Sequence, residues 1–91
     1  LKPSELTPFT ALAALLLLRA AGLPAGVLQV VTGYGEPVGA ALVEAADFVR
    51  FTGSTAVGRR VAEACGRRLV PCSMELGGKN PMIVFPDVDV P

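Results

Sequence analysis

The octapeptide Phe51-Thr52-Gly53-Ser54-Thr55-Ala56-Val57-Gly58 joins a strand pattern to a helix pattern. A short strand is expected over residues 48–51, and a helix over residues 54–67 begins at Ser54, a residue type that favours the helix cap. Free amides and the positive end of the helix dipole make such a junction suitable for an anion. The G-x-x-x-x-G spacing also fits a P-loop, but Arg59-Arg60 stand where that motif needs Lys-Ser/Thr, which argues against a nucleoside triphosphatase. Taken alone, the octapeptide is explained equally well by an ordinary serine cap.

Strand and helix patterns alternate outward from this junction along the whole chain. The expected elements are a helix over 8–22 with Thr7 as its cap, a strand over 27–32, a helix over 37–46, the strand and helix just described, and strands over 69–75 and 81–85. Leu1-Lys2 is expected to be the frayed end of an earlier strand. Such alternation is typical of right-handed βαβ crossovers. The predicted fold class is therefore α/β, with a parallel sheet of alternating strands and helices.

Size and composition limit what the chain can be. Its 91 residues make at most one small domain, and 52% of them are hydrophobic while only 18% are charged. A small independent domain needs more polar surface than this, so the composition favours a segment that sits inside a larger body. The chain also begins at Leu1 and ends at Pro91. We therefore expect a fragment of a longer protein.

Charge and residue usage exclude several function classes. The 8 basic and 8 acidic residues balance, which argues against a nucleic-acid partner. Arg59-Arg60 and Arg67-Arg68 are interpreted as a solvated helix surface. Two cysteines and no histidine argue against a disulfide scaffold and a zinc site, and favour a reducing, cytoplasmic location. The apolar run 11–18 is far shorter than the roughly 20 residues of a membrane span, so we expect a buried helix and no membrane partner.

A second glycine-rich segment, Gly33-Tyr34-Gly35-Glu36-Pro37-Val38-Gly39, follows a predicted strand and opens a predicted helix. Its third glycine comes one residue late for the ordinary dinucleotide fingerprint, and no acidic residue stands about 20 positions further on. A tight turn is the better interpretation of this segment alone.

The segment Met74-Glu75-Leu76-Gly77-Gly78-Lys79-Asn80-Pro81 sets a carboxylate before a turn that a ligand could approach closely. As a general base, Glu75 needs partly apolar surroundings, and Met74, Leu76 and Met82 are expected to supply them. The alternative is a surface glutamate at the end of a strand.

Three segments, Lys2-Pro3-Ser4-Glu5, Phe51–Thr55 and Glu75–Lys79, resemble the aldehyde dehydrogenase superfamily in their order and sequence. The resemblance covers essentially the whole chain and implies a Rossmann-like domain in which the cofactor lies differently from the ordinary arrangement. Residues 1–91 would form part of the NAD(P)-binding domain of an enzyme that oxidises a small-molecule aldehyde to a carboxylic acid. The family's nucleophilic cysteine lies well after the glutamate and its oxyanion asparagine lies before Leu1. The catalytic cysteine domain is thus expected to be absent, and these residues alone are expected to be inactive.

The resemblance also assigns roles to individual residues. Glu75 corresponds to the general base that activates water to hydrolyse a cysteine thioester. The implied cofactor-binding residues are Lys2, Ser4 and Glu5 at the ribose, Gly33 along the adenosine side, Gly53, Ser54 and Gly58 around the pyrophosphate turn, Val57 beside the adenine, and Leu76 and Gly77 beside the nicotinamide. A carboxylate at Glu5 would repel a 2′-phosphate, which favours NAD over NADP. No metal site is implied.

The run 65–73 before the glutamate looks similar to succinate-semialdehyde dehydrogenases, and the complete enzyme is expected to be a homo-oligomer. Cys65 is expected to be packed on a helix and Cys72 to occupy a strand, neither with a catalytic role. Two alternatives remain: a non-catalytic nucleotide-binding or structural α/β remnant, and an interaction module built on the helix over 9–18.

Overall fold

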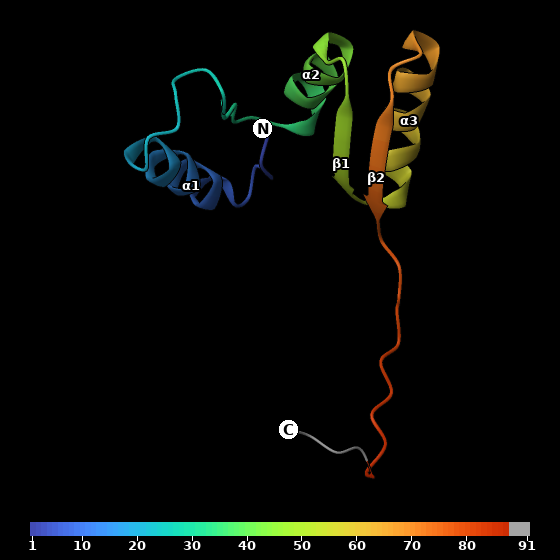
Figure 1. Ribbon diagram of the computed structural model, residues 1–91. Helices are drawn as coiled ribbons and strands as arrows, with labels where there is room; N and C mark the ends of the chain where they lie inside the picture. Colours follow the sequence, from blue (N-terminus) through green and yellow to red (C-terminus); the bar gives the residue numbers. More distant parts are fainter. Residues whose placement is uncertain (88–91) are drawn as a thin grey trace.

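The computed structural model describes residues 1–87. Its elements are, in chain order, α1 (Pro8–Ala20), a single wide helical turn η1 (Gly35–Gly39), α2 (Ala40–Ala45), β1 (Val49–Gly53), α3 (Thr55–Arg68) and β2 (Cys72–Leu76). Figure 1 shows α2, β1, α3 and β2 gathered in one body, with α1 set apart from it and the chain after β2 running away from it.

The two strands form a parallel pair joined by α3. Their register runs from Val49 opposite Cys72 to Gly53 opposite Leu76, so both strands end at the same edge. Parallel strands need a crossover connection, and α3 provides it while packing on both strands and on α2. The predicted α/β class with a parallel sheet is confirmed by this βαβ unit.

Local sequence explains where α3 begins and ends. Ser54 is the N-cap, and its hydroxyl oxygen accepts a hydrogen bond from the Val57 amide at 3.3 Å, as predicted. The helix ends at Arg68 and is capped by Leu69, which takes the left-handed backbone conformation with φ 55°. Arg67 and Arg68 lie in the last turn, where the helix dipole favours cations.

The core of the βαβ unit is small. Among the described hydrophobic residues, Val49 and Cys65 are buried, and Cys65 is only 1% exposed. Gly58 is also buried, because the side chain of Leu76 packs directly over its Cα. A glycine is needed at this position for α3 to approach β2 so closely.

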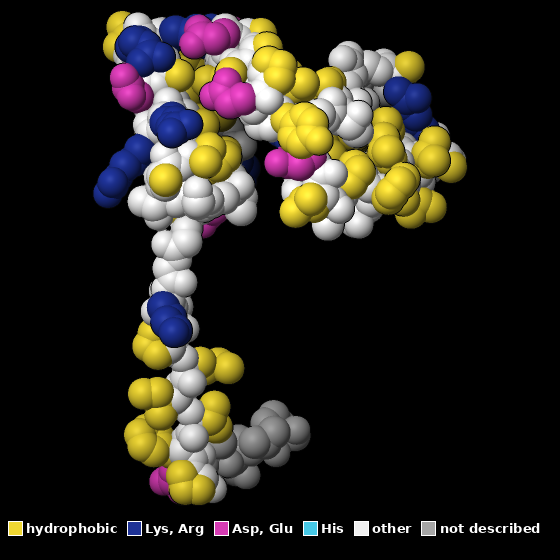
Figure 2. All heavy atoms as spheres, turned by 180° about the vertical axis from the view of Figure 1, so that it is seen from behind, with side chains coloured by type: hydrophobic (Ala, Val, Ile, Leu, Met, Phe, Trp, Pro, Cys, Tyr) yellow, Lys and Arg dark blue, Asp and Glu magenta, His cyan; other side chains and the backbone are white. Residues whose placement is uncertain are grey.

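Helix α1 begins at Pro8 as expected, although the Thr7 side chain makes no capping hydrogen bond. The prediction that this helix is buried is wrong for the described residues: none of its side chains is buried, and large ones such as Phe9, Leu16 and Leu17 are exposed. Figure 2 shows the resulting cluster of apolar side chains over α1, and another along the chain after β2. In the part of the chain that the structure describes, no helix is both long and apolar enough to cross a membrane.

Two of the predicted strands are not strands in the structure. Residues 27–32 are irregular. Leu1 bonds to two of them: its amino group donates to the Gln29 carbonyl at 2.7 Å and its carbonyl accepts from the Val31 amide at 2.9 Å. Residues 81–85 run free of the sheet, with their large apolar side chains exposed. Both segments have strand-forming residues, but a strand requires a neighbouring backbone to pair with. The predicted helix over 37–46 is divided between η1 and α2, and the predicted strand over 69–75 begins only at Cys72.

Two glycines of α3 allow a matched test of the close packing between α3 and β2. We expect Gly58→Ala to destabilise the whole protein by about 1–3 kcal/mol, because a Cβ there overlaps the Leu76 side chain. Gly66→Ala on the same helix meets nothing within 4 Å and should stabilise by up to about 1 kcal/mol through helix propensity. Urea unfolding of both variants measures the difference, and equal effects would contradict the packing described here.

Candidate functional site

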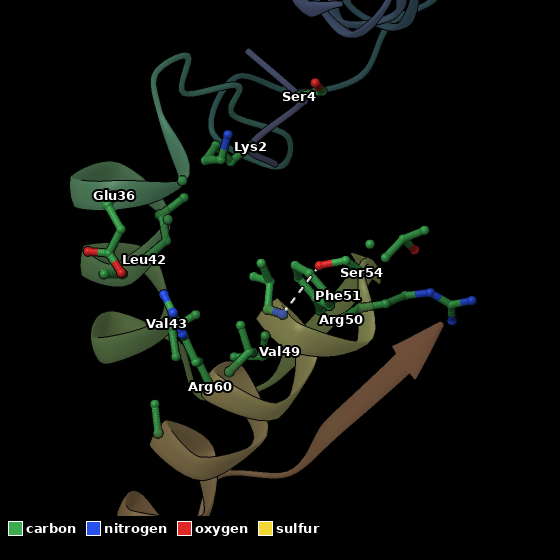
Figure 3. Close-up of a pocket in the computed structure, with 18 of the residues that line it drawn as sticks. Lys2, Ser4, Glu36, Leu42, Val43, Val49, Arg50, Phe51, Ser54 and Arg60 are labelled. Carbon is green, nitrogen blue, oxygen red and sulfur yellow. Dashed lines mark hydrogen bonds between the residues drawn. The ribbon is translucent and has the colours of Figure 1, made fainter. Parts of the chain in front are cut away.

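A hollow of about 970 Å³ opens beside β1, between the N-terminal segment, η1 and α2 on one side and the start of α3 on the other (Figure 3). Its volume falls within the roughly 300–1,000 Å³ of ordinary ligand sites. Six of the residues predicted to bind cofactor line it: Lys2, Ser4, Glu5, Gly53, Ser54 and Val57. Segments more than 50 residues apart in the sequence are thus brought to one cavity.

Lys2 ties the N-terminal segment to the glycine-rich turn. Its Nζ donates to the Pro3 carbonyl at 2.7 Å and to the Gly33 carbonyl at 2.9 Å, and lies 3.7 Å from Glu5 Oε2. The Lys2 side chain is only 16% exposed, whereas that of Glu5 is 42% exposed. Gly33 does not line the hollow itself. Its φ of 141° and the closeness of the Val38 side chain, 2.6 Å from where a Cβ would lie, both require glycine.

The junction of β1 and α3 presents backbone donors. The Ser54 hydroxyl accepts from the Val57 amide, and the Ser54 carbonyl accepts from the Gly58 amide at 2.9 Å. The amides of Thr55 and Ala56 are left without an intrahelical partner, as in the first turn of any α-helix. The Ser54 hydroxyl hydrogen also remains able to donate. Together with the helix dipole, these groups suit a phosphate.

One face of α3 forms a wall of the hollow. The side chains on it, spaced three or four residues apart, are Val57, Arg60, Val61, Ala64 and Arg67. The sequence predicts a solvated helix surface for both arginine pairs, and Arg60 is exposed as expected. Its place on the wall of the hollow was not predicted, although its spacing of three residues from Val57 could have indicated it.

Arg68 closes one end of the gap between α2 and α3. Its Nη1 donates to the Val43 carbonyl at 2.7 Å and to the Ala46 carbonyl at 3.1 Å, and its Nε lies 3.9 Å from Glu44 Oε2. The C-terminal carbonyls of α2 thereby gain a cationic donor, and the two helices are held together.

Glu75 does not line the hollow. It lies on β2 opposite Thr52, with its side chain 63% exposed, and its Oε1 is 4.0 Å from Nη2 of Arg50, whose side chain is 69% exposed. An ion pair between exposed side chains contributes little stability. The apolar surroundings expected from Met82 are not formed, because Met82 is 88% exposed on the segment after β2.

The common edge of the two strands still relates Glu75 to the hollow. Gly53 pairs in register with Leu76, so Ser54 and Gly77 each follow the last residue of a strand at the same edge. Ligands of parallel α/β sheets bind at this carboxyl edge. Gly58 and Leu76 contact each other and do not line the hollow. Gly77 does not line it either, and it has open space around its Cα.

The cysteines differ in accessibility. Cys65 is buried and Cys72 is exposed, and both are free thiols. Burial, with the neighbouring Cys72 as a second cause, raises the pKa of the Cys65 thiol. Among residues 1–87, no group of three or more histidine, cysteine or acidic side chains could hold a metal ion.

We expect iodoacetamide to alkylate Cys72 before Cys65, since the thiolate is the reactive form and the raised pKa of Cys65 disfavours it. The raised pKa of Cys65 also makes the free energy of unfolding depend on pH. Its contribution to stability is fully present below the pKa of an unfolded thiol and is lost as the pH rises through the higher pKa of the folded protein. Peptide mass spectrometry after timed alkylation measures the order, and equal rates for the two thiols would contradict it.

Comparison with known proteins adds to this geometry. The sequence profile described as "Aldehyde dehydrogenase family" matches residues 1–91. The chain is 58% identical over 83 residues to a Mycolicibacterium smegmatis protein with the provisional name succinate-semialdehyde dehydrogenase, NADP(+). It is 57% identical over 91 residues to phenylacetaldehyde dehydrogenase of Pseudomonas fluorescens.

Among solved structures, a crystal structure of an NAD-dependent aldehyde dehydrogenase from Sinorhizobium meliloti superposes with a TM-score of 0.85 at 49% identity, over 97% of this chain. The two curated relatives are matched over 91% and 98% of this chain. The chain spans only 16% of the first relative's length and 18% of the second, and 18% of the solved chain.

Proposed function

This chain belongs to the aldehyde dehydrogenase family, and on that premise we propose that residues 1–91 form part of the NAD(P)-binding domain of an enzyme that oxidises an aldehyde to a carboxylic acid. The observation that carries the proposal is the convergence of Lys2, Ser4, Glu5, Gly53, Ser54 and Val57 on one hollow beside the carboxyl edge of a parallel strand pair. NAD(P)+ supplies the hydride acceptor, and the chain's own residues hold it.

Each group in the hollow has a role suited to its chemistry. Lys2 and Glu5 supply a cationic donor and an anionic acceptor, 3.7 Å apart, for the two hydroxyls of a ribose. Ser54 and the free amides of Thr55 and Ala56 receive the pyrophosphate, and Val57 packs beside the adenine. Gly33 contributes by holding Lys2 through its carbonyl, while the open backbone at Gly77 suits the nicotinamide end.

In this proposal the preference for NAD or NADP as cofactor depends on Glu5. The names of the relatives are divided, since one curated relative carries NADP(+) in its name and the solved structure is described as NAD-dependent. A carboxylate at the ribose repels a 2′-phosphate, so we propose that NAD is the preferred cofactor.

Replacing the carboxylate tests that preference. In the whole enzyme, Glu5→Gln should improve kcat/KM for NADP relative to NAD by roughly fivefold or more, which corresponds to the removal of about 1 kcal/mol of repulsion at 4 Å. Steady-state kinetics with both cofactors measure the ratio. An unchanged ratio would remove Glu5 from the choice of cofactor.

Glu75 is proposed to act as the general base that activates water for hydrolysis of the acyl-enzyme thioester. The support is its place on β2, near the strand edge that Ser54 follows, and the resemblance of Glu75–Lys79 to the glutamate segment of the family. Its 63% exposure among the described residues means that the apolar surroundings of the base come from residues outside this range. The cysteine that forms the thioester is likewise proposed to lie outside residues 1–91, so these residues alone are predicted to be inactive.

A burst experiment tests this role in the whole enzyme. Glu75→Gln should leave the first turnover of NADH formation intact, because acylation does not use the base, and slow steady turnover by roughly 10²-fold or more. Rapid-mixing absorbance records both phases. Asp87→Asn, on the segment after β2 and outside the hollow, is a matched carboxylate control that should change neither phase.

One alternative is favoured by the exposure of Glu75: a nucleotide-binding or structural α/β segment without catalysis. It predicts that Glu75→Gln changes neither burst nor steady turnover. Equal loss of both phases would also contradict the base role, because the glutamate would then act before deacylation.

Succinate semialdehyde is our proposed substrate, supported by the run 65–73 and by the name of one relative. The other relative, at nearly the same identity, is named for phenylacetaldehyde. The ratio of kcat/KM for these two aldehydes tests the proposal, and a preference for phenylacetaldehyde would reject it. A homo-oligomeric state and a cytoplasmic location remain expectations for the complete enzyme.

A further inference from the structure

Arg60 projects from α3 into the hollow, on the same helical face as Val57 and Val61. In Figure 3 its side chain extends from α3 toward α2. The apolar residues Leu42 and Val43 line the hollow on the α2 side. An exposed charged group therefore lies on one wall of a hollow whose two helical walls are largely apolar.

Arg60 differs from the other basic side chains around the hollow. Lys2, Arg50 and Arg67 have carboxylate partners in Glu5, Glu75 and Glu63. Arg68, at the end of the gap, bonds to carbonyls of α2. Within residues 1–87, Arg60 makes neither an ion pair nor a hydrogen bond. Its guanidinium is available to a ligand.

The chemistry of the guanidinium indicates which part of a dinucleotide it would contact. It is planar, weakly hydrated and stacks on aromatic faces. Glu36 and Glu44 also line the hollow and disfavour a phosphate near the α2 side. A flat, uncharged ring fits between apolar walls and beside a planar cation better than a phosphate does.

We propose that Arg60 stacks on the adenine ring of the bound dinucleotide and strengthens binding of its adenosine half. This inference rests on the proposed function, in which Val57, one turn earlier on α3, packs beside the same ring. Arg60 is then a binding residue for the base and contributes little to discrimination at the 2′ position.

The experiment compares three reduced cofactors in the whole protein by their fluorescence on binding. Arg60→Leu should weaken the binding of NADH and of NADPH by the same factor, about three- to thirtyfold. The affinity for reduced nicotinamide mononucleotide should not change, because this cofactor lacks the adenosine. Arg60→Lys keeps the charge and loses the planar group, so it should recover only part of the affinity. Arg59→Leu is the matched control, because Arg59 is the neighbouring exposed arginine outside the hollow.

The remaining outcomes overturn the inference in distinguishable ways. A much larger loss for NADPH than for NADH identifies Arg60 as a phosphate partner. An Arg60→Leu variant that binds like Arg59→Leu rejects the contact and leaves the proposed function standing. Failure of the unaltered protein to bind any of the three cofactors rejects both the proposed function and the stacking.

Discussion

The parallel pairing of β1 and β2 is the constraint on which the other features of the candidate site depend. Two parallel strands cannot be joined by a tight turn, so α3 must cross over between them. Because the pair is in register from Val49–Cys72 to Gly53–Leu76, both strands end at one edge. The capped start of α3 and the segment that carries Glu75 are therefore brought to that edge by backbone hydrogen bonds, before any side chain contributes.

Two cationic side chains then shape the hollow beside this edge. Lys2 joins the N-terminal segment to the carbonyl of Gly33, and Arg68 joins α3 to the carbonyls at the end of α2. Hydrogen bonds that involve a charged donor are among the stronger ones in proteins. Hydrogen bonds at two places thus fix the elements around the hollow, and Ser54 and Val57 line it.

The sequence predicts the features that depend on neighbouring residues. The Ser54 cap, the extent of α3 and the packing of Cys65 all follow from patterns within a few residues. The segments 27–32 and 81–85 have equally clear strand patterns, yet a strand also needs a partner, which no local pattern supplies. The local pattern left two interpretations of Glu75 open, a base in apolar surroundings and a surface glutamate, and it did not indicate the place of Arg60 on the hollow. Each depends on which distant element lies opposite.

The contact between Gly58 and Leu76 has a consequence for how this segment tolerates change. Gly58 belongs to the first turn of the helix that Ser54 caps, and Leu76 directly follows Glu75 in the chain. A bulkier residue at Gly58 displaces both neighbours at once. In a mutational scan this position should therefore be pleiotropic: a single substitution would disturb the capped start of α3 and the end of β2 together, so effects at the proposed cofactor site and at the proposed base could not be separated here.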